Sequence, residues 1–194
     1  MPFILDHNLL FVHIPKTGGS SIEKKFDIDK QKRDECFSYT EQLYNNIIFA
    51  PQHFTPDLIE KHYPKLYKKC KKFTIVRNPY TKMISEFIYR EGEFTPDKFH
   101  NFVERIPLQI TDHNLPQKRY FNNNIFYSQV LRFEHLKSGF EILANSNNFS
   151  SSLPHENKSG INTSDLVSEI KRETLDLLNN YYAEDFEFLK YKMI

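Results

Sequence analysis

The sequence carries almost no net charge, which limits the partners that long-range electrostatics can select. Its 26 Lys and Arg residues against 25 Asp and Glu residues give a formal net charge of +1. A field that weak predicts neither a nucleic acid nor a membrane surface as a partner. Any anion that the protein binds must therefore be held by a local site.

Cysteine and long apolar runs are also scarce. The two cysteines, Cys36 and Cys70, belong to no paired motif, which argues against a disulfide framework or a cysteine-based zinc site. No run approaches the roughly 20 apolar residues of a membrane-spanning helix, and the N-terminus has neither the basic nor the apolar region of a signal sequence. These absences predict a protein of the reducing cytoplasm without a membrane span.

Aromatic residues, in contrast, are abundant, with 18 Phe and 11 Tyr. This content favours a folded chain over disorder, which requires few aromatic residues and a high net charge. A chain of 194 residues is long enough to bury a substantial core. No linker or internal repeat is visible, so we expect residues 1–194 to form a single domain.

Short apolar runs alternate with helical patterns along the chain. Strands are predicted at 9–12, 47–50, 73–76 and 127–133, and helices at 22–26, after Pro79, and in one long segment that Thr163 or Ser164 caps and that continues through Leu178. Runs that are apolar throughout suit strands buried on both faces. The alternation predicts an α/β fold: a three-layer, P-loop-like domain whose mainly parallel central sheet is flanked by helices.

The first chemical motif lies between the first strand and the first helix. It consists of Lys16, Thr17, Gly18, Gly19, Ser20 and Ser21. Glycines let the backbone approach a phosphate, and the N–H groups at the start of a helix attract an anion. Because the lysine precedes the glycines, the nucleotide-hydrolase P-loop pattern is not met. The alternative is a tight turn with an exposed lysine.

The second motif places Arg77 at the end of the third strand, with Ser85 eight residues later. Ligands of parallel α/β sheets bind at the carboxyl ends of strands. A Mg²⁺-dependent phosphotransferase would need an acidic residue there, whereas a guanidinium suits a phosphate without a metal. The alternative is a structural ion pair. Two cationic groups at two strand ends favour a ligand with separated phosphates.

These residues resemble the carbohydrate sulfotransferases that include heparan sulfate 2-O-sulfotransferase. The segment 11–21 is similar to that family's 5′-phosphosulfate loop, and 76–87 to its 3′-phosphate motif, including the spacing from Arg to Ser. Weaker similarities follow in the same order at 113–117, 153–159 and 182–186. The resemblance covers nearly the whole chain, which is shorter than animal members of the family and is expected to lack their membrane anchor and lumenal cysteines.

The resemblance implies a sulfotransferase that uses 3′-phosphoadenosine 5′-phosphosulfate (PAPS). We expect no metal, because an in-line displacement does not require one and the sequence shows no His/Cys cluster at zinc spacing. It implies that Lys16 and the loop through Ser21 hold the phosphosulfate, and that Arg77 and Ser85 hold the 3′-phosphate. It also suggests Lys158 and Ser159 in a loop over the nucleotide. The acceptor is expected to be a hydroxyl, of a saccharide in the first instance.

A histidine is the natural base for an acceptor hydroxyl at neutral pH. His53 follows the predicted strand 47–50, and the similar family places a catalytic histidine in this interval, so His53 is the chosen base. Its alternative role is that of a turn histidine bonded to backbone. His113 is expected to bind the acceptor or to serve as an alternative base, and His13 to be structural.

Two other functions remain open from the sequence. A nucleotide kinase would share the strand–loop–helix opening, and a non-catalytic module would bind a nucleotide or glycan without turnover. Six lysines between Lys61 and Lys72 form either a solvated face or a track for an acidic glycan. The sequence does not choose the acceptor or the oligomeric state.

Overall fold

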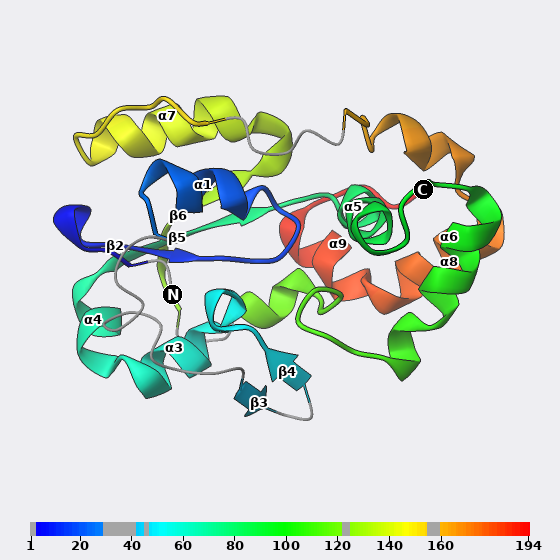
Figure 1. The fold of residues 1–194 in the computed structure, drawn as a ribbon, viewed down its shortest axis with the longest axis horizontal. Coiled ribbons are helices and arrows are strands. Elements are labelled where there is room, and N and C mark those ends of the chain that lie inside the picture. Colours follow the sequence, from blue (N-terminus) through cyan, green and yellow to red (C-terminus); the bar gives the residue numbers. More distant parts are fainter. Residues whose placement is uncertain (1–2, 29–41, 45–46, 122–124, 155–159) are drawn as a thin grey trace.

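The computed structural model describes residues 3–28, 42–44, 47–121, 125–154 and 160–194, with the backbone alone for 42–44. Figure 1 shows a central sheet with α1 (Gly19–Lys25) and α7 (Leu136–Ser146) over one face and α3 (Pro56–His62) and α4 (Pro64–Lys69) over the other. The predicted α/β fold with three layers and a mainly parallel sheet is confirmed.

The central sheet has four strands in the order β1-β2-β5-β6. These are β1 (Phe3–Ile4), β2 (Leu9–Val12), β5 (Lys71–Val76) and β6 (Tyr127–Arg132). β2, β5 and β6 run parallel, while β1 pairs with β2 in the antiparallel sense. The carboxyl ends of β2 and β5 are therefore neighbours at one edge of the sheet, as the two predicted anion motifs require.

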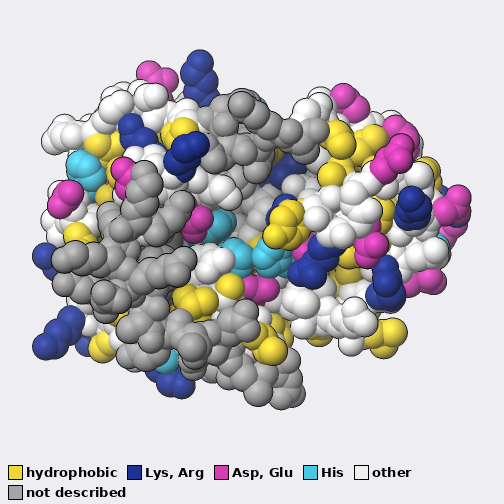
Figure 2. Space-filling model, in the orientation of Figure 1, with side chains coloured by type: hydrophobic (Ala, Val, Ile, Leu, Met, Phe, Trp, Pro, Cys, Tyr) yellow, Lys and Arg dark blue, Asp and Glu magenta, His cyan; other side chains and the backbone are white. Residues whose placement is uncertain are grey.

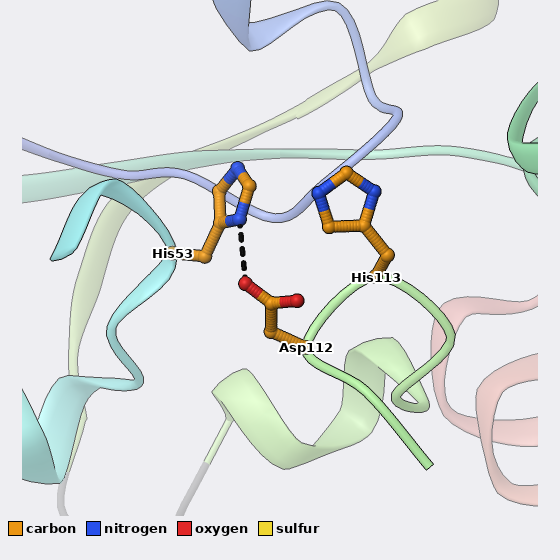
Figure 3. A group of neighbouring side chains, drawn as sticks. All are labelled: His53, Asp112 and His113. Atoms are coloured by element: carbon orange, nitrogen blue, oxygen red, sulfur yellow. Dashed lines mark hydrogen bonds and ion pairs between the residues drawn. The ribbon is translucent and has the colours of Figure 1, made fainter. Parts of the chain in front are cut away.

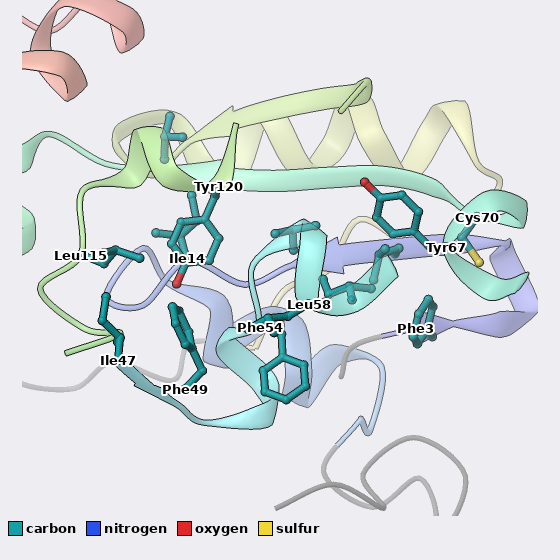
Figure 4. Close-up of a cluster of buried hydrophobic side chains, with 14 of the residues drawn as sticks. Phe3, Ile14, Ile47, Phe49, Phe54, Leu58, Tyr67, Cys70, Leu115 and Tyr120 are labelled. Carbon is teal, nitrogen blue, oxygen red and sulfur yellow. The ribbon is translucent and has the colours of Figure 1, made fainter. Parts of the chain in front are cut away.

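Alternate side chains of β2 explain why its apolar run is continuous. Leu9 and Phe11 enter the cluster that packs against α1 and α7, whereas Leu10 and Val12 enter the cluster that packs against α3 and α4 (Figure 4). Successive side chains of a strand point to opposite faces. A strand covered on both faces thus needs apolar residues at every position.

Beyond the carboxyl ends of the strands, the chain builds a helical region with its own core. It contains α5 (Pro79–Glu91), α6 (Pro96–Glu104), α8 (Arg172–Tyr181) and α9 (Ala183–Leu189) (Figure 1). Asn78 caps α5 by accepting the Tyr80 N–H at 2.9 Å, and Pro79 occupies the first turn, where its missing N–H costs nothing. None of the helices in the described ranges is both long and apolar enough to cross a bilayer.

The predicted strand at 47–50 forms, but it does not belong to the central sheet. β4 (Ile47–Phe49) pairs in the antiparallel sense with β3 (Gln42–Tyr44) in a separate two-stranded sheet. Ile47 and Phe49 face the core while Ile48 is exposed. A strand with one buried face fits a small covering sheet, so the expectation that 47–50 ends at the edge of the central sheet was wrong.

The prediction of one long C-terminal helix was also wrong. A 3₁₀ helix at Asp165–Glu169 precedes α8, and Ile170 between them is extended, with φ −68° and ψ 129°. Both segments bury apolar side chains in the same cluster, so two short helices satisfy the apolar pattern as well as one. Thr163 does not cap the segment, because its hydroxyl bonds to Arg77 instead.

Candidate active site

The two predicted anion-binding cations line one cavity. Lys16 follows β2 and Arg77 follows β5, and both side chains reach a cavity of about 580 Å³ between the sheet and α5. The Arg77 Nη1 donates to the backbone carbonyl of Lys16 at 3.0 Å, which ties the two strand ends together. The lining of this cavity is Lys16, Arg77, Thr81, Ser85, Ile88, Tyr89, Phe133, Glu134, Ile161, Asn162, Thr163 and Ser164.

Arg77 is held rigidly although it is only 4 % exposed. Its Nε donates to the Thr81 hydroxyl at 3.1 Å, its Nη2 to the Thr163 hydroxyl at 2.6 Å, and its guanidinium lies 4.0 Å from the centre of the Phe133 ring. Burial lowers the pKa of Arg77 to about 10, so the group is still charged at neutral pH. Within the described ranges no carboxylate forms an ion pair with it, and its neutral partners leave room for an anion.

The backbone of Arg77 is fixed by residues distant in sequence. The Gln117 side chain accepts the Arg77 N–H at 2.9 Å and donates to the Arg77 carbonyl at 2.7 Å. Asp185 in turn accepts the backbone N–H groups of Gln117 and Lys118 at 2.8 and 2.7 Å. The segments 113–117 and 182–186 therefore meet in space and position the backbone of Arg77.

The loop after β2 has a backbone conformation that would let its N–H groups approach an anion closely. Lys16 has φ 65° and Gly18 φ 90°, a left-handed conformation that favours glycine at position 18. A Cβ on Gly19 would lie 2.1 Å from His13 Nε2, so no larger residue fits between the helix start and that ring. The two glycines are thus needed for different reasons, one for its φ angle and one for space.

Other residues of the loop differ in what they can offer. The Thr17 hydroxyl donates to the Ile14 carbonyl at 2.8 Å, so its proton is already used inside the loop. Ser20 is exposed and Ser21 half-buried in the first turn of α1, while Ser85 of α5 lines the cavity together with Arg77. Lys158 and Ser159 lie outside the described residues.

Lys16 is the second cation of the cavity. Its ammonium lies 4.2 Å from the centre of the Tyr89 ring, which is itself 69 % exposed. Burial lowers the pKa of Lys16, Glu86 opposes this shift, and the positive charges of Arg77 and Arg90 add to it. An anion beside Lys16 would offset both the cost of burying the ammonium charge and its repulsion by Arg77 and Arg90.

Three histidines form a row beside the cavity, each paired with a carboxylate. The ring centres of His13 and His53 are 4.9 Å apart, as are those of His53 and His113. The Nδ1 atoms contact the carboxylates of Glu23, Asp112 and Glu86 respectively, each at 2.8 Å. Figure 2 shows histidine side chains gathered near the middle of the face it presents, beside basic and acidic groups.

His53 is presented by a short 3₁₀ turn, Pro51–His53, that follows β4. Its Nδ1–H donates to Asp112 Oδ2 at 2.8 Å (Figure 3), and the same oxygen accepts the Ala50 N–H at 3.2 Å. Burial lowers the pKa of His53 to about 4, although the hydrogen bond to Asp112 opposes that shift. His53 is therefore neutral at pH 7, with its Nδ1 fixed as donor and its Nε2 left as acceptor.

Asp112 and His113 belong to a loop pinned at several points. Asn114 accepts the Thr111 N–H at 2.8 Å and donates to the Gln109 carbonyl at 2.9 Å, while the buried Lys82 ammonium donates to the His113 carbonyl at 2.7 Å. Burial opposes the ionisation of Asp112, yet the hydrogen bonds from His53 and from the Ala50 N–H lower the pKa of Asp112 below its usual value. The dyad is therefore a carboxylate and a neutral imidazole.

The sequence predicts His53 and His113 as site residues but does not indicate Asp112 or Thr163. Asp112 immediately precedes His113, yet a single aspartate in a loop carries no signal of its own. His53 reaches the site although the reason given for its position, a strand of the central sheet, was wrong. His13, expected to be structural, contacts both Glu23 and the ring of His53.

Comparison with known proteins gives one match. A family model described as "Sulfotransferase family" matches residues 4–192, which is nearly the whole chain. A search of curated proteins and a search of solved structures each found no match.

Proposed function

Because this chain belongs to the sulfotransferase family and transfers a sulfuryl group, we propose that its donor is PAPS, its acceptor a carbohydrate hydroxyl and its base His53. Family membership does not favour the kinase alternative. The donor, the acceptor and the base rest on the geometry of the site and on the resemblance of its motifs to carbohydrate sulfotransferases.

The observation that carries this proposal is the shared cavity of Lys16 and Arg77. Two cations at neighbouring strand ends suit a ligand with two anionic groups, and a cavity of about 580 Å³ is in the range that holds a nucleotide-sized ligand. Arg77, Thr81 and Thr163 already converge on one point, and Ser85 faces the same cavity. We assign the 3′-phosphate to that group and the phosphosulfate to Lys16 and the loop through Ser21.

The reaction requires a proton acceptor and stabilisation of the leaving phosphate. The neutral His53 takes the acceptor hydroxyl proton at Nε2, and the imidazolium that results is stabilised by the ionised Asp112 at Nδ1. The hydroxyl oxygen forms a bond to sulfur as the bond from sulfur to the phosphate oxygen breaks. Lys16 stabilises the negative charge that develops on the leaving adenosine 3′,5′-bisphosphate. Most of the rate comes from positioning and electrostatics.

The acceptor side has fewer constraints. Tyr89 is exposed, and its ring stacks on His113 with centres 6.1 Å apart, so it offers an aromatic surface next to the base. Phe94, Phe99 and Phe102 pack in the helical core and are not available to a sugar. The lysine-rich segment precedes or begins β5, at the end of the strand remote from the site, which favours a solvated face over a glycan track.

A direct test measures sulfuryl transfer from PAPS to a panel of glycans with a chelator present. We expect Lys16→Ala and His53→Ala to lose activity by roughly 10²-fold or more while staying folded. Lys68→Ala on the exposed face of α4 and His100→Ala on α6 are matched controls and should retain activity. Wild-type turnover by His53→Ala would remove that residue from the base role.

Binding of adenosine 3′,5′-bisphosphate separates the remaining alternatives. Calorimetry should show binding to the wild-type protein, weaker binding to Arg77→Ala, and nearly unchanged binding to His53→Ala. Binding with no turnover on any acceptor would support a non-catalytic module. Absence of binding would contradict PAPS as the donor.

A further inference from the structure

The histidine row contains donor atoms that suit a metal ion. His53, Asp112 and His113 each offer one ligand atom, and these atoms lie within 4.8 Å of one another (Figure 3). We propose that these three side chains bind a transition-metal ion such as Zn²⁺, and that the bound ion inhibits the enzyme by occupying its base. The inhibitory part of this proposal rests on the proposed role of His53.

The orientation of His113 favours metal binding. Its Nδ1 contacts Glu86 Oε2 at 2.8 Å, and Figure 3 shows its other ring nitrogen on the side of His53. The other oxygen of the Glu86 carboxylate accepts from Arg90 Nε, so Glu86 is placed to accept the proton of His113 Nδ1. His113 then carries its lone pair on Nε2, which faces His53.

This pairing of a carboxylate with a ligand histidine is the usual outer support of a protein metal site. It fixes the ring and its tautomer and increases the basicity of the ligating nitrogen. Asp112 is supported similarly, since the Ala50 N–H holds its Oδ2 at 3.2 Å. Both supports exist before any ion binds, so little has to be ordered on binding.

The donor set selects the class of ion. Two imidazole nitrogens and one carboxylate oxygen suit Zn²⁺, Co²⁺ or Ni²⁺, whereas Mg²⁺ and Ca²⁺ prefer oxygen ligands alone. With bonds of about 2.0–2.1 Å, tetrahedral ligands lie roughly 3.4 Å apart, so atoms that are up to 4.8 Å apart must approach by up to about 1.4 Å. Rotation of the His113 side chain, which is 21 % exposed, supplies this movement while Lys82 holds the His113 backbone carbonyl.

Metal binding would disable the base through its tautomer. A neutral imidazole holds one ring proton, and in the free dyad His53 donates that proton from Nδ1 to Asp112. An ion on Nδ1 shifts the proton to Nε2, the atom that has to accept the hydroxyl proton. The ion and the reaction therefore compete for the same imidazole, and inhibition should be reversed by a chelator.

The test uses Co²⁺ as a spectroscopic probe, without donor or acceptor present. We expect the wild-type protein to bind one equivalent of Co²⁺ with visible d–d absorption typical of tetrahedral coordination by nitrogen and oxygen, and Zn²⁺ to displace it. Asp112→Asn and His113→Gln should each weaken binding at least about tenfold, and Glu86→Gln, which removes an outer support, by about 10–100-fold. His100→Gln, a histidine bonded to Thr174 in the helical region, should bind as wild type.

Several results would overturn the proposal. They are binding of Co²⁺ that is the same in Asp112→Asn and wild type, binding that Mg²⁺ competes away equally well, or no binding at millimolar Co²⁺. Binding without any inhibition of turnover would overturn the inhibitory part. Adenosine 3′,5′-bisphosphate binding, measured separately with chelator, reports on the proposed function, so failure of one does not imply failure of the other.

Discussion

At the scale of single residues, the position of one proton decides whether His53 acts as a base. Asp112→Asn preserves the size of the side chain but replaces the carboxylate with an amide that can donate to Nδ1 and leave the proton on Nε2. We expect turnover to fall roughly 10²-fold or more with little change in adenosine 3′,5′-bisphosphate affinity. Steady-state kinetics with calorimetry measures both. Asp97→Asn, which breaks an exposed ion pair to Lys171, is the matched control.

Thr163 allows a second test at this scale. Its hydroxyl accepts from Arg77 Nη2 at 2.6 Å in a buried setting, so Thr163→Val leaves that donor without its partner. An unsatisfied buried donor costs about 1–3 kcal/mol. We expect Thr163→Val to lower nucleotide affinity by about tenfold while turnover at saturating donor changes little. A loss confined to turnover would contradict the assignment of Thr163 to the 3′-phosphate group.

At the scale of elements, the turn from β2 into α1 depends on the space left by a glycine. A Cβ at position 19 would lie 2.1 Å from the His13 ring, and that ring is packed against His53 and bonded to Glu23. Overpacking of this kind costs about 1–3 kcal/mol. Gly19→Ala should therefore lower the midpoint of urea unfolding and reduce turnover, because it displaces His13 and the histidine beside it.

Gly139 in α7 provides the control for that substitution. The three nearest atoms to a Cβ there all belong to the Leu131 side chain, with its Cδ2 at 3.2 Å, and alanine is favoured over glycine within a helix by up to about 1 kcal/mol. Gly139→Ala should leave stability equal or slightly higher and turnover unchanged. Equal effects of the two substitutions would contradict a specific role for the space beside His13.

The same scale shows what the sequence could and could not predict. β2, β5 and α5 were predictable because their apolar patterns and the Asn78-Pro79 helix start are local signals. The pairing of β4 with β3 was not, since a short apolar run does not reveal its partner. The break at Ile170 was equally hidden, because both the long helix and the broken one bury the same face.

At the scale of the whole molecule, the site joins segments that only the tertiary fold can bring together. His53 and Asp112 are 59 residues apart, and Arg77 and Thr163 are 86 apart. The sequence therefore predicted the lysine, the arginine and the histidine, whose side-chain types indicate their chemistry, but not the aspartate and the threonine that hydrogen-bond to the histidine and the arginine. Partners of this kind depend on where loops meet, which local patterns do not encode.

Burial of His53 also makes the stability of the whole fold depend on pH. Its pKa is lowered to about 4 in the folded protein, below the usual 6.5, so the unfolded chain binds a proton more readily between these values. The free energy of unfolding should therefore be constant above pH 6.5 and fall as the pH decreases toward 4, by about 3 kcal/mol in total from this group.

Urea titrations with chelator should show this decrease in the wild-type protein and a flatter profile in His53→Gln. Above pH 6.5 the difference in free energy of unfolding between this variant and the wild-type protein should stay constant, because the imidazole of His53 is neutral there. Identical slopes between pH 4 and 6.5 would mean that His53 is hydrated and readily protonated in the fold, which would also remove the reason to regard it as a neutral base.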